Sequence, residues 1–435
     1  MTQLSTREKF APAHPFVAAA SSKRVPLWLL AIPTSVFCFL VLPLMYGRLA
    51  FGPQYMLAFP GPYLDHVLLN CAANFAVFMT SAHLKGRLDR KLAAVLSRAL
   101  LVHGSLAFSI LLLHLVHSNH VMITGFLVSA LLAPLYMVFE HTTAQPQVAV
   151  IGPRTGAHRR LSEIYKGNVK VLEDPHLDVR RCDLILTPSM AELTPSWASF
   201  VSRAMLSGVP VRHVAEFLEE ADGIVSIEHF DLDHLPLGGL TSYRLRKRLL
   251  DVLLIVVTAP ITLVLTFAGV VAVLVSMGRP VMFVQSRTGV SGEPFQIYKL
   301  RTMRGLRPDE KAQTTSHGDV RVTAVGAWLR RFRIDELPQL WNVLKGDMSI
   351  IGPRPEWTKL SEEYQKHFPA YAYRHLVRPG ITGWAQVRSG YAGDLEETKV
   401  KVGYDLFYIK NLSFALDVQI LLRTIITLVT GNGAR

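Results

Sequence analysis

Long apolar stretches dominate the first third of the chain. Four runs cover residues 26–46, 64–84, 98–118 and 121–140. Each run is near the ~20 residues that a membrane-spanning helix needs. Lysine and arginine fill the loop after the second run and the segment after the fourth, whereas the other loops hold few. The positive-inside rule therefore predicts a four-helix transmembrane bundle over residues 26–146, with both ends in the cytoplasm and a flexible cytosolic tail over residues 1–25.

The polarity pattern changes between residues 147 and 240. Four short apolar segments, VAVIGP, VKVLED, DLILTPS and VPVRHV, alternate with helix-like patterns. Buried strands that alternate with helices predict a small doubly wound, Rossmann-like α/β domain. Gly152 and Gly156 flank the first turn and Glu173 follows the second strand, which is only part of a dinucleotide-binding pattern. Two interpretations stay open: a structural turn, or a retained nucleotide or regulatory ligand.

A fifth apolar run covers residues 249–277 and carries Pro260 near its middle. Proline removes one helical hydrogen bond and kinks the helix. Basic residues lie on both sides of the run: Arg244, Arg246, Lys247 and Arg248 before it, and Arg279 and Arg287 after it. Because basic residues at both ends favour keeping both ends on the cytoplasmic side, we expect a re-entrant membrane helix kinked at Pro260. The alternative is an ordinary fifth span, which would place the following domain outside the cell.

The charge balance indicates an anionic partner. The formal net charge is +13, and half of the residues are hydrophobic. Such a balance suits nucleic acid, phospholipid or a phosphorylated substrate. The long apolar runs exclude nucleic acid as a good fit and favour the lipid bilayer together with a phosphorylated substrate.

Residues 241–435 form the predicted catalytic domain, of mixed α+β character. The segment PFQIYKLRTM, residues 294–303, has the pattern of a strand. A strand would place Lys299 and Arg301 on one face, where two cations could bind phosphate oxygens. By itself, the segment is explained more simply as an exposed basic strand edge.

The segment 329–355 is the most informative in the chain. It places acidic and basic side chains together: Asp335, Glu336, Arg330 and Arg354. Carboxylates can attack phosphorus or hold Mg²⁺, and fixed cations can clamp phosphate oxygens. The acidic pair is predicted to open a helix that ends near Lys345, before Gly346. Adjacent helical side chains diverge, which favours one carboxylate facing phosphorus and the other a metal.

Several linked motifs then identify a family. QSRTG, YKLRTM, LPQLWNVLKGDMSIIGPRP and RPGITGWAQV follow the proline-broken helix in order. Over roughly residues 242–431, this set resembles the bacterial polyprenyl-phosphate hexose-1-phosphate transferases. The spans and the α/β domain resemble the long-form members. One departure is Ala259 before Pro260, where members often have serine.

The resemblance implies a two-step reaction. Asp335 would attack the sugar-bearing phosphate of a UDP-sugar, releasing UMP and forming a phosphosugar–aspartyl intermediate. Undecaprenyl phosphate would then accept the sugar 1-phosphate. Lys299, Arg330 and Arg354 would contact phosphate oxygens, and Mg²⁺ would lie at Asp335 and Glu336.

The resemblance also implies a location and a pathway. We expect an enzyme of the bacterial inner membrane with a cytoplasmic active site, which initiates exopolysaccharide, capsule or O-antigen assembly. Glucose or galactose is the expected sugar, and a homodimer through the membrane or α/β regions is the expected assembly. Two alternatives are a non-catalytic, nucleotide-sensing scaffold of polysaccharide assembly and an inverting glycosyltransferase that releases UDP.

Overall fold

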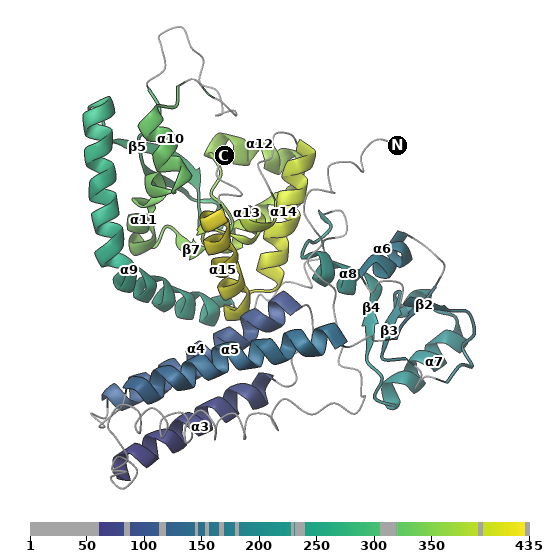
Figure 1. Cartoon of the computed structure of the whole chain (residues 1–435). Coiled ribbons are helices and arrows are strands. Elements are labelled where there is room, and N and C mark those ends of the chain that lie inside the picture. Colours follow the sequence, from purple (N-terminus) through teal and green to yellow (C-terminus); the bar gives the residue numbers. More distant parts are fainter. Residues whose placement is uncertain are drawn as a thin grey trace. The chain divides into compact units, whose positions relative to one another are not determined.

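The computed structural model describes most of the chain after residue 60. The described residues are 61–81, 88–112, 119–143, 147–152, 156–164, 169–178, 182–227, 230, 240–304, 319, 321–389 and 395–430. The predicted tail and the first predicted span, residues 26–46, lie outside them. The chain forms two compact units, Met1–Asp222 and Gly223–Arg435 (Figure 1).

Three apolar helices open the described part of the first unit. They are α3 (Gly61–Ser81), α4 (Leu88–Leu112) and α5 (Asn119–Thr143). Their common core contains Val77, Phe78, Val95, Ala99, Ala133 and Met137. Three of the four predicted spans correspond to described helices, so the four-helix bundle stays a prediction.

A buried polar chain links the three helices. The His103 ring and the Ser129 hydroxyl are 2.9 Å apart, and Ser129 also donates to the side-chain oxygen of Asn74. All three side chains are buried. A buried polar group is costly unless it is hydrogen-bonded, so these contacts fix how the helices can pack.

Four parallel strands form the α/β part of the first unit. They are β1 (Val148–Ile151), β2 (Val169–Leu172), β3 (Leu184–Thr187) and β4 (Val211–His213), in the order β2-β1-β3-β4. Every residue of β1 and β3 is buried, as expected for parallel strands covered on both faces. The four predicted strands are confirmed.

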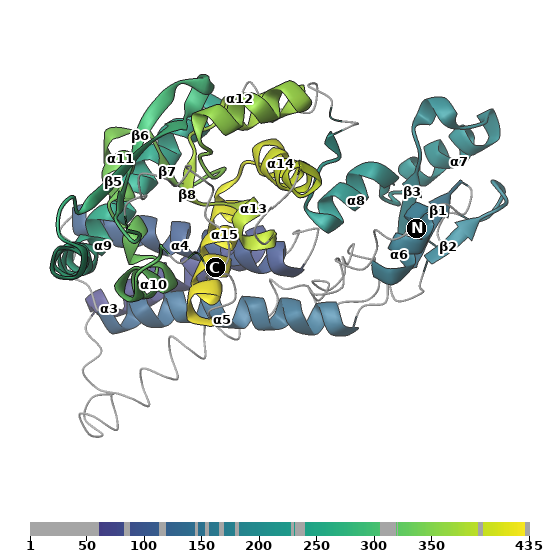
Figure 2. The same cartoon turned by 90° about the horizontal axis from the view of Figure 1, so that it is seen from above.

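Helices cover both faces of this sheet (Figures 1 and 2). On one face, Leu161 of α6 (Gly156–Ile164) and Phe217 of α8 (Val214–Asp222) pack with Val150. On the other face, Phe200 of α7 (Pro195–Leu206) packs with Ile185. The predicted doubly wound α/β domain is therefore confirmed.

Helix α9 (Leu240–Met277) belongs to the second unit and contains Pro260. Figure 1 shows it as two arms that meet at an angle. Within the described residues, two helices are long and apolar enough to cross a membrane, α4 over Arg90–Leu111 and α9 over Tyr243–Met277.

Short strands and helices follow α9 and build the core of the second unit. Strands β5 (Met282–Thr288) and β6 (Pro294–Leu300) form an antiparallel hairpin, and β7 (Ser349–Ile351) and β8 (Gly380–Thr382) pair in parallel. The helical elements are α10 (Ala324–Arg331), η9 (Ile334–Glu336), α11 (Gln339–Lys345), α12 (Thr358–His367), η10 (Pro369–Leu376), α13 (Trp384–Arg388), α14 (Leu395–Lys410) and α15 (Phe414–Thr430). The largest apolar core includes Tyr371, Leu406, Phe407, Ile409 and Ile420.

Three apolar side chains just after Asp222 belong to this second core. Val225 is buried there, and Ile227 and Phe230 pack against it. The Trp384 indole donates to the Gly223 carbonyl at 2.7 Å. The sequence placed the domain boundary at residue 240, but the two units divide after Asp222 because these apolar side chains fill the catalytic core.

Three fragments test the contribution of Val225, Ile227 and Phe230 to the core. The fragment beginning at Gly223 should be more stable to unfolding than the one beginning at Asp231 by about 3 kcal/mol or more, because burying one Val or Ile contributes ~1.5–3 kcal/mol. Thermal unfolding in detergent measures the difference. A third fragment beginning at Ser242 should melt with the Asp231 fragment. Equal melting of all three would show that residues 223–230 contribute nothing to the core.

Candidate active site

The acidic pair lies on a short 3-10 turn that is separate from the next helix. Arg333 has a left-handed backbone, with φ of 56°, and starts the turn Ile334–Glu336. Helix α11 begins only at Gln339, because Pro338 has no N–H with which to continue the helical hydrogen bonds. The prediction that the pair opens this helix is therefore wrong, whereas its end at Lys345, before a left-handed Gly346, is confirmed.

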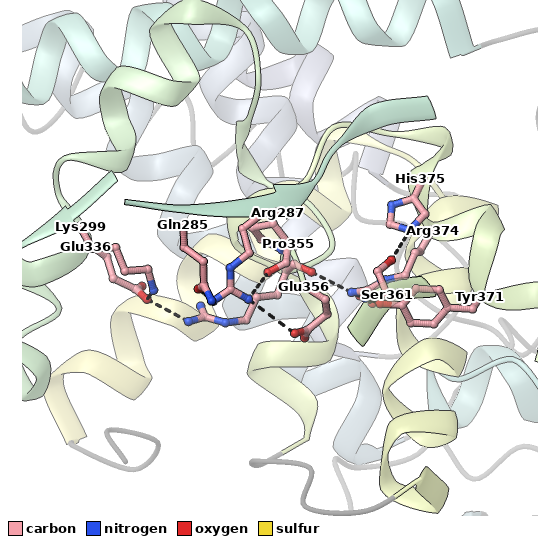
Figure 3. A network of polar contacts seen from close by, with 12 residues as sticks. Gln285, Arg287, Lys299, Glu336, Pro355, Glu356, Ser361, Tyr371, Arg374 and His375 are labelled. Atoms are coloured by element: carbon pink, nitrogen blue, oxygen red, sulfur yellow. Dashed lines mark hydrogen bonds and ion pairs between the residues drawn. The ribbon is translucent and has the colours of Figure 1, made fainter. Parts of the chain in front are cut away.

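Glu336 is a buried carboxylate surrounded by cations (Figure 3). Its Oε1 lies 2.8 Å from Lys299 Nζ and 3.0 Å from an Arg354 nitrogen, and its Oε2 lies 3.5 Å from an Arg333 nitrogen. Burial alone would raise the pKa of Glu336. The charges of Arg354, Lys299 and Arg333 outweigh that effect and hold the pKa well below its usual range. Glu336 is therefore a permanent anion.

Asp335 has a different environment. Its side chain is 8% exposed, and within the described residues its Oδ1 atom has no hydrogen-bond partner. Burial, together with the charge of Glu336, raises the pKa of Asp335 to about 6, against the opposing charges of Lys299 and Arg330. A buried carboxylate oxygen without a hydrogen-bond partner calls for a ligand, and a bound cation would supply one.

Hydrogen bonds to neighbouring residues hold Arg330 and Arg354 in place. Arg330 lies in the last turn of α10, and its Nε donates to the Thr302 hydroxyl at 2.9 Å. Arg354 follows β7, and its carbonyl accepts a hydrogen bond of 2.9 Å from Arg374. Arg374 is itself buried in an ion pair of 2.8 Å with Asp405. Sequence reasoning missed this support because the pair is separated by thirty residues and neither member lies in the acidic segment.

The two cations predicted to share one strand face, Lys299 and Arg301, have different partners in the structure. Lys299, on β6, reaches Glu336, but Arg301 lies just beyond the strand and donates to the Met277 carbonyl at the end of α9. Arg301 therefore binds the end of α9 and is not one of the cations that contact Glu336. Its contact with phosphate stays a prediction. Pro260 lies inside α9, as predicted for the kink.

The acidic pair fits a divalent cation of the Mg²⁺ type. Mg²⁺ in phosphoryl-transfer sites is usually bound through one or two carboxylates and substrate phosphates. The free Oδ1 of Asp335 provides such a ligand, and Glu336 adds negative charge beside it. The pair contributes two carboxylates, and no group of three or more acidic, histidine or cysteine side chains that could hold a metal occurs in the described part of the chain, this site included.

A buried carboxylate beside fixed cations is suited to phosphoryl groups, and in this chain it follows a long apolar helix.

Comparison with known proteins points to the same class of protein. Residues 242–431 match the family described as bacterial sugar transferase. An Aeromonas hydrophila protein named UDP-N-acetylgalactosamine-undecaprenyl-phosphate N-acetylgalactosaminephosphotransferase is 38% identical over 77% of this chain and 79% of its own length. The chain belongs to the bacterial sugar transferase family, which confirms the resemblance, and it is a membrane-associated protein.

Other relatives match a smaller part. The UDP-glucose:undecaprenyl-phosphate glucose-1-phosphate transferase of Escherichia coli K12 is 38% identical over 48% of this chain and 44% of its own length. The protein of the same name from Caulobacter vibrioides is 42% identical over 44% of this chain and 72% of its own length. The shared part is thus less than half of the chain in both.

The raised pKa of Asp335 predicts a pH-dependent stability. Because the folded state holds this proton more tightly than the unfolded state, its stabilising contribution is complete below pH 3.8 and is lost as pH rises through about 6. In metal-free protein, Asp335→Asn should match the parent chain near pH 4 and exceed it at pH 7 by on the order of 3 kcal/mol.

Thermal unfolding in detergent with a chelator, from pH 4 to pH 8, measures this gain. Glu362→Gln, on the exposed surface of α12, is the matched control and should show no pH-dependent difference. A constant offset between Asp335→Asn and the parent at every pH would contradict the assignment.

Proposed function

We propose that the chain transfers a sugar 1-phosphate from a UDP-sugar to a polyprenyl phosphate and releases UMP. The observation that carries this proposal is the contrast between the two adjacent carboxylates. Asp335 has a free oxygen, whereas Glu336 is held between Lys299 and Arg354. The names of the relatives, which act between UDP-sugars and undecaprenyl phosphate, support the same reaction class.

Asp335 is the nucleophile of the first step. Its carboxylate forms a bond to the sugar-bearing phosphorus, and the bond between that phosphorus and the bridging oxygen breaks. The electron pair remains on the bridging oxygen, which leaves as part of UMP. Lys299, Arg330 and Arg354 stabilise the developing negative charge on the phosphate oxygens.

The second step needs no strong general base. The acceptor is already an anion, and one of its oxygens attacks the phosphosugar–aspartyl group and regenerates Asp335. The main obstacle is repulsion between anions, which the fixed cations reduce. Asp335 and Glu336 would hold Mg²⁺, which would neutralise further phosphate charge.

The sugar remains open to experiment. Glucose or galactose was the expectation from the long-form resemblance. The relative that matches 77% of this chain carries N-acetylgalactosamine in its name, and the glucose relatives match 48% or less. UDP-glucose, UDP-galactose and UDP-N-acetylgalactosamine should therefore be compared as donors. The product would initiate an exopolysaccharide, capsule or O-antigen unit.

Both arms of α9 pack on the same catalytic domain, which supports a re-entrant helix. Before Pro260, Asp251 accepts a hydrogen bond of 3.1 Å from the Ile350 amide. After Pro260, Val273 packs with Leu329 and Ile334. A span that crosses the ~30 Å hydrocarbon core would carry its two ends to opposite sides.

The exposed residues of α9 fit the same arrangement. Large apolar side chains near its middle, Val256, Val257, Ile261, Leu263, Val264 and Phe267, are 62–70% exposed. Such a surface is stable in lipid and costly in water. We therefore infer that the bend enters one leaflet of the inner membrane, with the catalytic site on the cytoplasmic side.

The nucleophile assignment is tested by substitution. Asp335→Asn should abolish UMP release, since an amide cannot form the acyl phosphate, and Arg354→Ala should lower the rate about 10²–10³-fold. UMP release from a UDP-sugar in detergent is the assay. Release of UDP instead would indicate a glycosyltransferase. Absence of nucleotide release by the folded parent chain with every donor would favour a nucleotide-sensing scaffold.

Membrane topology gives a second test. In a chain without its native cysteines, single cysteines replacing Ser242 and Arg279 should both react only from the cytoplasmic side of intact cells. A cysteine replacing Ser118, at the predicted periplasmic end of the third apolar run, is the control and should react from outside. Periplasmic labelling at position 279 would make α9 an ordinary kinked span.

A further inference from the structure

The polar site continues from Lys299 and Glu336 to side chains of strand β5 (Figure 3). Gln285 and Arg287 are two residues apart on this strand and therefore share one face. Arg287 donates to the Gln285 side-chain oxygen at 2.7 Å and to the Pro355 carbonyl at 3.2 Å. Figure 3 draws Arg287 between Glu336 and Glu356. A row of polar side chains thus leads away from the nucleophile.

The charge of Arg287 is only partly balanced by the residues around it. The distance between an Arg287 nitrogen and the Glu356 carboxylate is 3.8 Å, which is beyond hydrogen-bond distance. Its Nε atom is buried without a hydrogen-bond partner, although the whole side chain remains 20% exposed. A half-buried guanidinium with this incomplete pairing is suited to bind a phosphate oxygen.

Each step of the proposed reaction brings a phosphate monoester to the side of phosphorus opposite Asp335. Phosphoryl transfer puts the attacking and leaving oxygens on opposite sides of phosphorus. Asp335 attacks in the first step, so UMP departs from the opposite side. In the second step Asp335 is the leaving group, so the acceptor must attack from the side that UMP vacated.

UMP and polyprenyl phosphate are both phosphate monoesters, which differ in the group that the phosphate carries. Resting on the proposed function, we propose that Arg287, positioned by Gln285, forms one phosphate-monoester subsite that the two ligands occupy in turn. In the first step it neutralises the phosphate that keeps the bridging oxygen and its electron pair. In the second it holds the acceptor while an acceptor oxygen bonds to the sugar-bearing phosphorus and the Asp335–phosphorus bond breaks.

Kinetics of the full chain in detergent test the shared subsite. Arg287→Ala should raise the inhibition constant of UMP and the KM for undecaprenyl phosphate together, each by about tenfold or more, the expected loss of one charge-assisted hydrogen bond. Arg287→Lys should recover part of both. Lys366→Ala, which removes an exposed cation from α12, is the control and should change neither constant beyond twofold. A rise in only one constant, or in neither, would overturn the proposal.

Binding of UMP to the resting enzyme separates this inference from the proposed function. Phosphorus NMR titration should show UMP binding to the parent chain and at least tenfold weaker binding to Arg287→Ala. If UMP binds through Arg287 but no UDP-sugar releases UMP, the transferase proposal fails and the subsite stands. If Arg287→Ala does not fold, Gln285→Ala should still raise both constants together, and unchanged constants in that variant would refute the subsite.

Discussion

The buried charge of Glu336 is the constraint on which the catalytic site depends. Lys299, Arg333 and Arg354 come from a strand, a left-handed residue and a proline-bounded loop, and they would repel one another without a common anion. A buried ion pair is stable only when its geometry satisfies the charges on both sides. Glu336 therefore determines where the cations point, and those cations in turn set the position that a phosphate can take.

The membrane helix and the catalytic domain form one folding unit. Asp251 and Val273, on opposite sides of Pro260, both contact the catalytic core. Gly269 allows the second arm to approach closely, since a Cβ there would lie 2.6 Å from a Leu300 methyl group. Leu300 directly follows Lys299, so the packing of α9 also fixes the strand that carries the Lys299 partner of Glu336. The Glu336 cluster is thereby tied to the long apolar helix.

Sequence reasoning reached the elements whose signals are local. The four α/β strands are short buried runs, and Gly346 ends α11 as predicted. It failed where tertiary contacts decide the outcome. The left-handed Arg333 and Pro338 isolate the acidic turn, and Arg301 turns to the end of α9 although strand periodicity groups it with Lys299. Arg287 stood in a recognised motif, but only the fold brings it beside Arg354.

Neighbouring carboxylates can have different tasks because their surroundings differ. Glu336 is firmly ionised, but both of its oxygens face cations, which lowers their ability to attack phosphorus. Asp335 has the higher pKa and an oxygen without a hydrogen bond, so it is the better nucleophile once ionised. Exchanging the two roles would require moving the cations from one side of the turn to the other. The left-handed Arg333 fixes that turn, and so the backbone decides which of two adjacent acids faces the cations.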